Sequence, residues 1–464
     1  MFRTIGDRPS LWESLLPAEV LRLPEELARV DALLDDPVFF APFAPYFHPV
    51  IGRPSTPAEW YLRLMFLKFR YRLGFESLCA EVSDSISWRR FCRIPLDGRV
   101  PHPTTLMKLT SRCGEEAVAG LNEALWARAA GAKLLRTARV RADTTVIPAN
   151  VACPTDTGLL AKAVGKLVRA ARRVQAAGGA TGTQMTDRRR AAARRMREVT
   201  STLRTRGKLS REESTRAIRR VTAALADLAE QAAAQATAVG RNGRRAVSKA
   251  ISGRVRGRLV RALDELAVTI GRTAQIVAQT RTRLADQVPD GATRLVSLHD
   301  PDARPIRKGR IDKPVEFGYK AQVADNDDGV ILDYSVEYGA APDAPQLVPA
   351  VQRIRRRAGR MPRAVTADRG YGEPAVERDL QTLGVRTVAI PRKAKTSPAR
   401  KNIEHSRSFH RLVKWRTGSE GRISYLKRRY GWDRTRLDGR HGAAIWCGHG
   451  VFAHNLVKIA VLAS

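Results

Sequence analysis

The chain has 464 residues, of which 82 are Lys or Arg and 46 are Asp or Glu, so its formal net charge is +36. Its length and its 43% content of hydrophobic residues suit two or three globular units and exclude a fibrous or disordered protein. So large a positive excess favours a polyanionic partner, above all nucleic acid, because neutralising phosphates releases condensed counterions. The alternative is an arginine-rich codon usage without a binding role.

Cysteine usage and hydropathy indicate the compartment. The five cysteines stand singly, without a CxxC pair, as is typical of reduced thiols in a cytosol: Cys79, Cys92, Cys113, Cys153 and Cys447. The N-terminus carries charges inside its apolar stretch and does not read as a secretory signal. The apolar run 442–462 is interrupted by polar residues that are costly in hydrocarbon. We expect a cytoplasmic, nucleoid-associated protein that does not enter a membrane.

Residues 1–137 show a helical pattern. The sequence Thr56-Pro57-Ala58-Glu59 predicts a capping box that opens a helix ending near Gly74. Shorter helices are expected over 75–95 and from about Thr104. Because Arg89, Arg90 and Lys108 lie on them, they are compatible with a helix-turn-helix-like DNA reader. A helical bundle whose surface arginines bind nothing is equally compatible with the pattern.

The pattern changes twice over the next 160 residues. Residues 138–151 alternate and are β-branched, which predicts a strand. Residues 156–296 contain no Phe, Trp or Tyr and have 30 Lys and Arg against 11 Asp and Glu, a net charge of +19. They predict long amphipathic helices in a hairpin or small bundle, broken at Gly178-Gly179 and at Gly240. Such helices are either a DNA-facing arm, which the charge favours, or a solvated spacer.

From residue 297 strands and helices interleave, which predicts an α/β domain with a mixed sheet. A hairpin is expected over 315–339 with its turn at 326–329, and strands over 364–367 and 386–390. Helices are expected over 347–358, over 374–383 and beyond Ser408.

Three acidic residues in this basic chain are candidates for chemistry. Asp143 lies in the middle of a predicted strand, where Asp is disfavoured. Asp368 follows the strand 364–367, and the carboxyl ends of strands favour catalytic residues. Glu420 stands in a helical segment rich in Arg and Lys. Each residue alone also has a structural explanation. Asp143 is explained by a solvent-facing strand position, Asp368 by a turn, and Glu420 by an ion pair with Arg416. The ordered trio favours a divalent metal site beside a phosphate.

Two other cofactor sites fit the sequence poorly. His405 with His410, and Cys447 with His449 and His454, match no standard zinc spacing. The Gly178-Gly179 region lacks a GK[ST] ending, so we expect no ATP dependence.

These motifs resemble the DDE transposases of bacterial insertion sequences, in the group with a Y-(2)-R-(3)-E-(6)-K signature. Arg416, Glu420 and Lys427 match its R, E and K, whereas Val413 stands at the Tyr position. The segments ADTTVIPANVACPTDTGLL, VEFGYKAQVADNDDGVILDYSVEYGAAPDAPQL and TADRGYG resemble the first-Asp, central hairpin and second-Asp segments of the family. Residues 56–110 resemble the helical domain commonly found before its catalytic domain.

The resemblance implies an α/β protein whose catalytic domain is RNase H-like, with a mixed sheet, and whose chain has four parts. These are an N-terminal helical, DNA-binding domain (1–137), the first part of the catalytic domain (138–155), an Arg-rich helical insertion after the first catalytic strand (156–296) and the remainder of the catalytic domain (297–464).

It also implies the chemistry. Asp143, Asp368 and Glu420 would be catalytic and would bind two Mg²⁺ ions, with Mn²⁺ as a substitute. Arg416, Lys427, Arg422 and Arg369 would contact DNA. The expected reaction is cleavage at the terminal inverted repeats of the element and strand transfer into target DNA, by a homodimer in the active complex. The alternatives are an RNase H-like nuclease without strand transfer and a catalytically idle DNA-binding relative.

Overall fold

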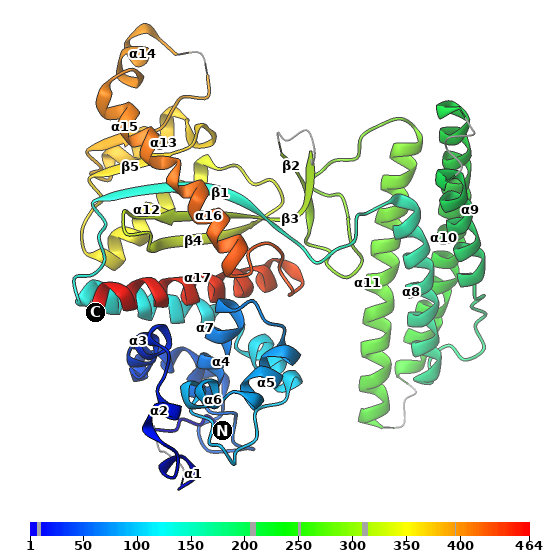
Figure 1. The fold of residues 1–464 in the computed structure, drawn as a ribbon. Coiled ribbons are helices and arrows are strands. Elements are labelled where there is room, and N and C mark those ends of the chain that lie inside the picture. The colour runs from blue at the N-terminus through cyan, green and yellow to red at the C-terminus, as the bar shows by residue number, and fades with distance from the viewer. Residues whose placement is uncertain (7–10, 205–209, 249–251, 309–313, 395) are drawn as a thin grey trace. The chain divides into compact units, whose positions relative to one another are not determined.

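The computed structural model describes residues 1–464 except 7–10, 205–209, 249–251, 309–313 and 395 (Figure 1). The chain divides into two compact units. The first comprises residues 1–150 and 318–464, and the second comprises residues 151–317.

A mixed sheet forms the centre of the first unit. Its order is β3-β1-β5-β6, and β4 also pairs with β3. The strands are β1 (Arg139–Pro148), β3 (Val315–Asp325), β4 (Ile331–Tyr338), β5 (Ala364–Ala367) and β6 (Thr387–Ala389). β1 runs antiparallel to β3 and parallel to β5, and this places β1, which is almost wholly buried, in the interior of the sheet. The predicted strands and the predicted 315–339 hairpin are confirmed.

Helices cover the sheet and build the N-terminal part of this unit. Those before β1 are α1 (Leu11–Ser14), α2 (Ala18–Leu21), α3 (Glu25–Leu34), η1 (Pro37–Phe39), η2 (Ala41–Tyr46), α4 (Ala58–Arg70), α5 (Phe75–Asp84), α6 (Ile86–Cys92) and α7 (Pro103–Gly131). Those after β4 are α12 (Ala344–Ala358), η4 (Arg369–Tyr371), α13 (Pro374–Thr382), α14 (Pro398–Glu404), α15 (Arg407–Arg416), α16 (Gly418–Arg429) and α17 (Gly439–Ala463). Figure 1 shows α16 crossing the sheet at β1, which it contacts.

α17 joins the N-terminal helices to the sheet, because it packs on α3, α4, α7 and β4. Among the described helices it alone is long and apolar enough to cross a membrane, but 78% of its most apolar window is buried inside the fold. Its buried Asn455 exchanges hydrogen bonds with the backbone of Ile331. Burial lowers the pKa of His449 and of His454 to about 3, so both are neutral. α17 is therefore a core helix of this unit.

The second unit contains a helical bundle whose core is aliphatic. α8 (Asp156–Ala176), α9 (Arg189–Arg204), α10 (Arg211–Val247) and α11 (Gly253–Leu284) pack through Ala, Leu, Val and Ile side chains such as Leu167, Ala229 and Leu266. The helical prediction is confirmed, and Gly178-Gly179 does follow the end of α8. Gly240 is not a break, because it lies inside α10. β2 (Arg304–Arg307), which the sequence pattern does not predict, pairs with β3.

The start of α4 corrects a second prediction. Pro57 precedes the helix and no side chain caps it, so the expected capping box is absent. The Glu59 carboxylate is buried and accepts a hydrogen bond from the Ile5 backbone N–H at 2.8 Å instead. α4 also ends at Arg70, before Gly74, because Arg72 takes a left-handed conformation with φ of 59°. Tertiary contact with the N-terminal segment thus replaces the local cap.

Candidate active site

Two of the predicted carboxylates lie side by side on parallel strands. β1 and β5 pair with Ala142 opposite Ala367, and Asp143 and Asp368 are the next residues along each strand. Asp143 is 7% exposed and accepts a hydrogen bond from the Thr144 N–H at 2.8 Å. Asp368 is half-buried, begins η4 and accepts a hydrogen bond from the Gly370 N–H at 2.7 Å. One oxygen of each carboxylate is thus held by backbone.

The electrostatics of this pair indicate an excess of negative charge. Burial raises the pKa of Asp143 to about 6, and the charge of Asp368 adds to the shift. The Thr144 N–H and Arg416 act in the opposite direction. Burial also raises the pKa of Asp368, followed by repulsion from Asp343. A cation at this position would relieve the repulsion.

Glu420 is linked to Asp143 through Arg416. The Arg416 guanidinium lies 3.2 Å from an Asp143 carboxylate oxygen and 3.3 Å from one of Glu420. The Glu420 side chain is 66% exposed, whereas that of Arg416 is 15% exposed. The structure therefore brings Asp143 and Asp368 together and places Glu420 on the other side of one arginine.

Arg416 and Glu420 lie on two successive helices, although the helical pattern around Glu420 predicts one helix for both. Arg416 is the last residue of α15, and Glu420 lies in the first turn of α16. The Trp415 carbonyl, which an unbroken helix would pair with the Ser419 amide, accepts a hydrogen bond from Arg141 at 2.8 Å. A Cβ atom at Gly418 would lie 2.1 Å from the same guanidinium, so a larger residue at this position would displace Arg141.

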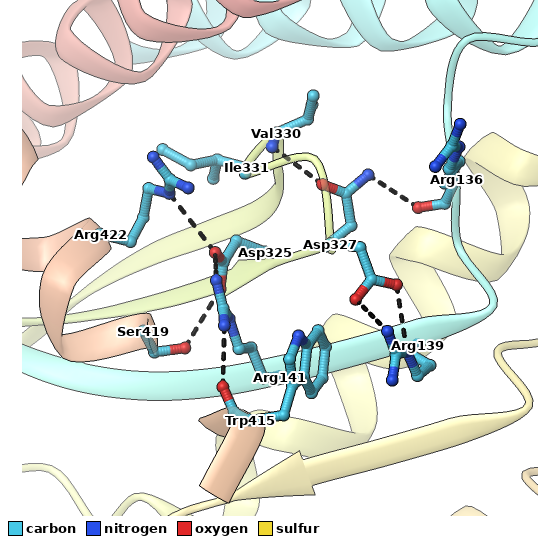
Figure 2. A network of polar contacts seen from close by, with 12 residues as sticks. Arg136, Arg139, Arg141, Asp325, Asp327, Val330, Ile331, Trp415, Ser419 and Arg422 are labelled. Carbon is cyan, nitrogen blue, oxygen red and sulfur yellow. Dashed lines mark hydrogen bonds and ion pairs between the residues drawn. The ribbon is translucent and has the colours of Figure 1, made fainter. Parts of the chain in front are cut away.

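A buried carboxylate, Asp325 at the end of β3, fixes this helix junction (Figure 2). It accepts two hydrogen bonds from Arg141, at 2.9 and 2.7 Å, and one from the Ser419 hydroxyl at 3.1 Å. Arg422 of α16 approaches it at 3.4 Å. Arg141 and Asp143 are two residues apart on β1 and lie on the same face. Asp325 therefore ties the start of α16 to the strand that carries Asp143.

The sequence interpretation did not single out Asp325, Arg141, Asp343 or Lys320. Asp343 lies next to Asp368, since a Cβ atom at Gly370 would be 2.7 Å from an Asp343 oxygen and 2.8 Å from one of Asp368. Lys320 of β3 pairs with Asp343 at 2.7 Å. An available signal was the two-residue spacing of Arg141 and Asp143, because residues i and i+2 share a face of a strand. The partners of Arg141 depend on the fold and left no local signal.

Arg422, Arg369 and Lys427, which were expected to contact DNA, have different surroundings in the fold. Arg422 faces the buried Asp325. Arg369 is exposed, and its guanidinium donates to the carbonyls of Arg392 and Lys393 at 2.9 and 3.0 Å. Lys427 lies on α16 and is partly buried.

The carboxyl groups offer oxygen ligands to a metal ion, but they are not assembled around one position. Within the described ranges, no group of three or more His, Cys, Asp or Glu side chains is arranged to hold a metal. The geometry accounts for this, because the Arg416 guanidinium lies between Asp143 and the exposed Glu420. The adjacent Asp143 and Asp368, whose charges repel each other, still fit a hard divalent cation.

Comparison with known proteins identifies the family. The description "Transposase domain (DUF772)" matches residues 17–112, and "Transposase DDE domain" matches residues 293–456. The chain is 30% identical over 162 residues to the uncharacterized protein ORF8 in the nfe locus of Rhizobium meliloti, covering 32% of this chain and 74% of that protein. No solved structure matches the chain significantly. Because the two transposase descriptions cover the N-terminal helices and most of the sheet, the chain belongs to the DDE transposases of insertion sequences, DNA-transposing enzymes that generally use divalent metal ions.

Proposed function

We propose that Asp143, Asp368 and Glu420 are the catalytic carboxylates of this transposase and that they bind two Mg²⁺ ions, which Mn²⁺ can replace. The observation that carries the proposal is the adjacency of Asp143 and Asp368 on β1 and β5, with Glu420 joined to Asp143 through Arg416. When bound, the ions supply Lewis-acid stabilisation of the attacking and leaving oxygens of the phosphodiester.

The groups around these carboxylates orient them and hold the DNA. The Thr144 and Gly370 amides orient Asp143 and Asp368. For Glu420 to join them, Arg416 must release both carboxylates, and its guanidinium then becomes available to a DNA phosphate, for which its planar fork is suited. Lys427 lies seven residues beyond Glu420, about two helical turns further along α16, where it would hold the same strand as a point charge.

The finer family assignment agrees with this arrangement. Arg416, Glu420 and Lys427 fit the R, E and K of the Y-(2)-R-(3)-E-(6)-K signature, while Val413 replaces its Tyr. The order of a central-strand Asp, a neighbouring strand-end Asp and a helical Glu supports an RNase H-like catalytic domain, with the helical bundle inserted after β1 and the N-terminal helices serving DNA binding. A homodimer would join two element ends in the active complex.

Binding of Mn²⁺ in the presence of a short DNA duplex, followed by electron paramagnetic resonance, tests the assignment without requiring turnover. Asp143→Asn and Asp368→Asn should each weaken Mn²⁺ binding at least tenfold. Glu420→Gln should reduce the number of ions bound. Glu373→Gln is a matched control, because Glu373 is an exposed carboxylate paired with Lys393. Mn²⁺ binding that is equal in all four variants and the wild type would refute the proposed ligand set.

A further inference from the structure

A basic hollow lies in the N-terminal helical part of the first unit. Its volume is about 690 Å³, and four arginines but no Asp or Glu contribute to its walls. The residues that line it are Arg3, Phe47, Arg53, Pro54, Ser55, Thr56, Pro57, Trp60, Arg99, Val100, Pro101, Thr105, Leu109 and Arg112. We call this set the arginine hollow.

Three separate segments bring the arginines together. The N-terminal segment lies beside residues 53–58, because the Ser55 N–H donates to the Met1 carbonyl and the Arg3 N–H donates to the Ser55 hydroxyl. This places Arg3 and Arg53 near each other despite their separation in sequence. Arg99 lies on the loop before α7, and Arg112 lies on α7 itself.

Arg89 helps to shape the loop that presents Arg99. Its guanidinium donates to the carbonyls of Pro95 at 3.0 Å and Gly98 at 2.9 Å. Arg89 therefore has an internal structural role.

The four arginines of the hollow are exposed and have no carboxylate partner within the described residues. In the same part of the unit, Arg63 pairs with Asp31 and Asp35, and Arg70 pairs with Glu26. Arg112 is the most fixed of the four, because its guanidinium lies over the Phe47 ring at 4.6 Å. Four cations without neutralising partners around one concavity repel each other, and an anion would relieve the repulsion.

We infer that the arginine hollow is a second DNA-binding surface, which holds phosphodiester groups of the duplex. Guanidinium groups bind phosphate oxygens through paired N–H donors. The first turns of α4 and α7 border the hollow through Pro57, Trp60 and Thr105, and helix N-termini carry partial positive charge. DNA is the anion that this enzyme must hold, as its family establishes. The inference rests on the DNA binding proposed above for the N-terminal helices and assigns residues to it, but it does not depend on the assignment of the catalytic carboxylates.

The test measures duplex affinity by fluorescence anisotropy between 50 and 200 mM KCl, in EDTA, so that metal binding and catalysis play no part. One variant replaces Arg3, Arg53, Arg99 and Arg112 by Gln. A matched control replaces four exposed arginines of the same unit outside the hollow, Arg22, Arg355, Arg378 and Arg386. The slope of log affinity against log salt should fall by about 0.9 for each lost phosphate contact in the hollow variant. The control should keep a slope close to that of the wild type.

A smaller variant protects the test against misfolding. Arg53→Gln with Arg99→Gln alters two exposed side chains, and it should lower the slope by about half as much as the fourfold variant. Equal slopes for the wild type, both hollow variants and the control would overturn the inference. A slope lowered equally in the hollow variants and the control would also overturn it, because it would show only the effect of net charge.

Discussion

At the scale of single residues, Asp143 shows how a local conflict in the sequence marks a site. A carboxylate is unfavourable in a buried strand, and that conflict made Asp143 a candidate before its neighbours were known. The structure then pairs β1 with β5 and sets Asp368 beside it. Asp325 is buried as well, but it follows the alternating part of a hairpin strand and precedes a turn-forming Asn-Asp-Asp-Gly run. The sequence did not mark it as a site residue, because its partners Arg141, Ser419 and Arg422 are distant in sequence.

The charge on Asp143 should destabilise the metal-free protein. Its pKa is raised from an ordinary 3.8 to about 6, so the folded state holds the proton more tightly than the unfolded state. The penalty is therefore present above pH 6 and disappears as the pH falls through 6 towards 4, and at neutral pH it corresponds to about 3 kcal/mol at most. We expect Asp143→Asn to raise the free energy of unfolding by about 1 to 3 kcal/mol at pH 8.

Urea unfolding in EDTA at pH 8 and pH 4.5 measures this difference between wild type and variant. The gain should shrink towards zero at the lower pH. A variant less stable than the wild type at pH 8 would show that the ion pair with Arg416 outweighs burial and repulsion.

At the scale of elements, the junction of α15 and α16 determines where Glu420 lies. The helical pattern beyond Ser408 predicted both helices, but not the break between them. The break depends on Arg141, whose guanidinium reaches from β1 to donate to the Trp415 carbonyl and packs closely against Gly418. Such a break cannot be predicted from a local pattern, because a side chain from another element causes it.

The substitution Asp325→Asn tests whether Asp325 positions α16 for DNA cleavage in addition to stabilising the fold. The amide keeps the shape of Asp325 but leaves Arg141 without a neutralising carboxylate, which typically costs about 3 to 5 kcal/mol. Because α16 then loses its anchor on β1, the single-turnover rate of DNA cleavage should fall at least tenfold while duplex affinity stays unchanged.

Asp333→Asn is a matched control, because Asp333 is equally buried and pairs with Arg353 and Arg357 at 2.7 and 2.8 Å. It should lose similar stability and retain the cleavage rate at a temperature where both variants are folded. Equal losses of cleavage in the two variants would assign Asp325 to general stability alone.

At the scale of the whole molecule, the sequence predicted the order of strands and helices in the sheet but not the extent of the units. The second unit covers residues 151–317, and it includes β2 and a connecting segment beyond the Arg-rich helices. Composition marked only 156–296, because the excess of Lys and Arg over Asp and Glu ends there, although aromatic residues remain absent until Phe317. The connecting segment has no periodic signal, and the strand β2, which pairs with the following strand β3, is only four residues long.

The central claim is that Asp143, Asp368 and Glu420 together catalyse metal-dependent cleavage of DNA by this transposase. The most direct measurement is the cleavage rate of a labelled duplex that carries an element end, in Mn²⁺, for Asp143→Asn, Asp368→Asn and Glu420→Gln beside Glu373→Gln. Each of the three should lose cleavage to background while binding the duplex at least as tightly as the wild type, since removing negative charge does not weaken phosphate contacts. Glu373→Gln should cleave normally. Wild-type cleavage by any one of the three variants would contradict the claim.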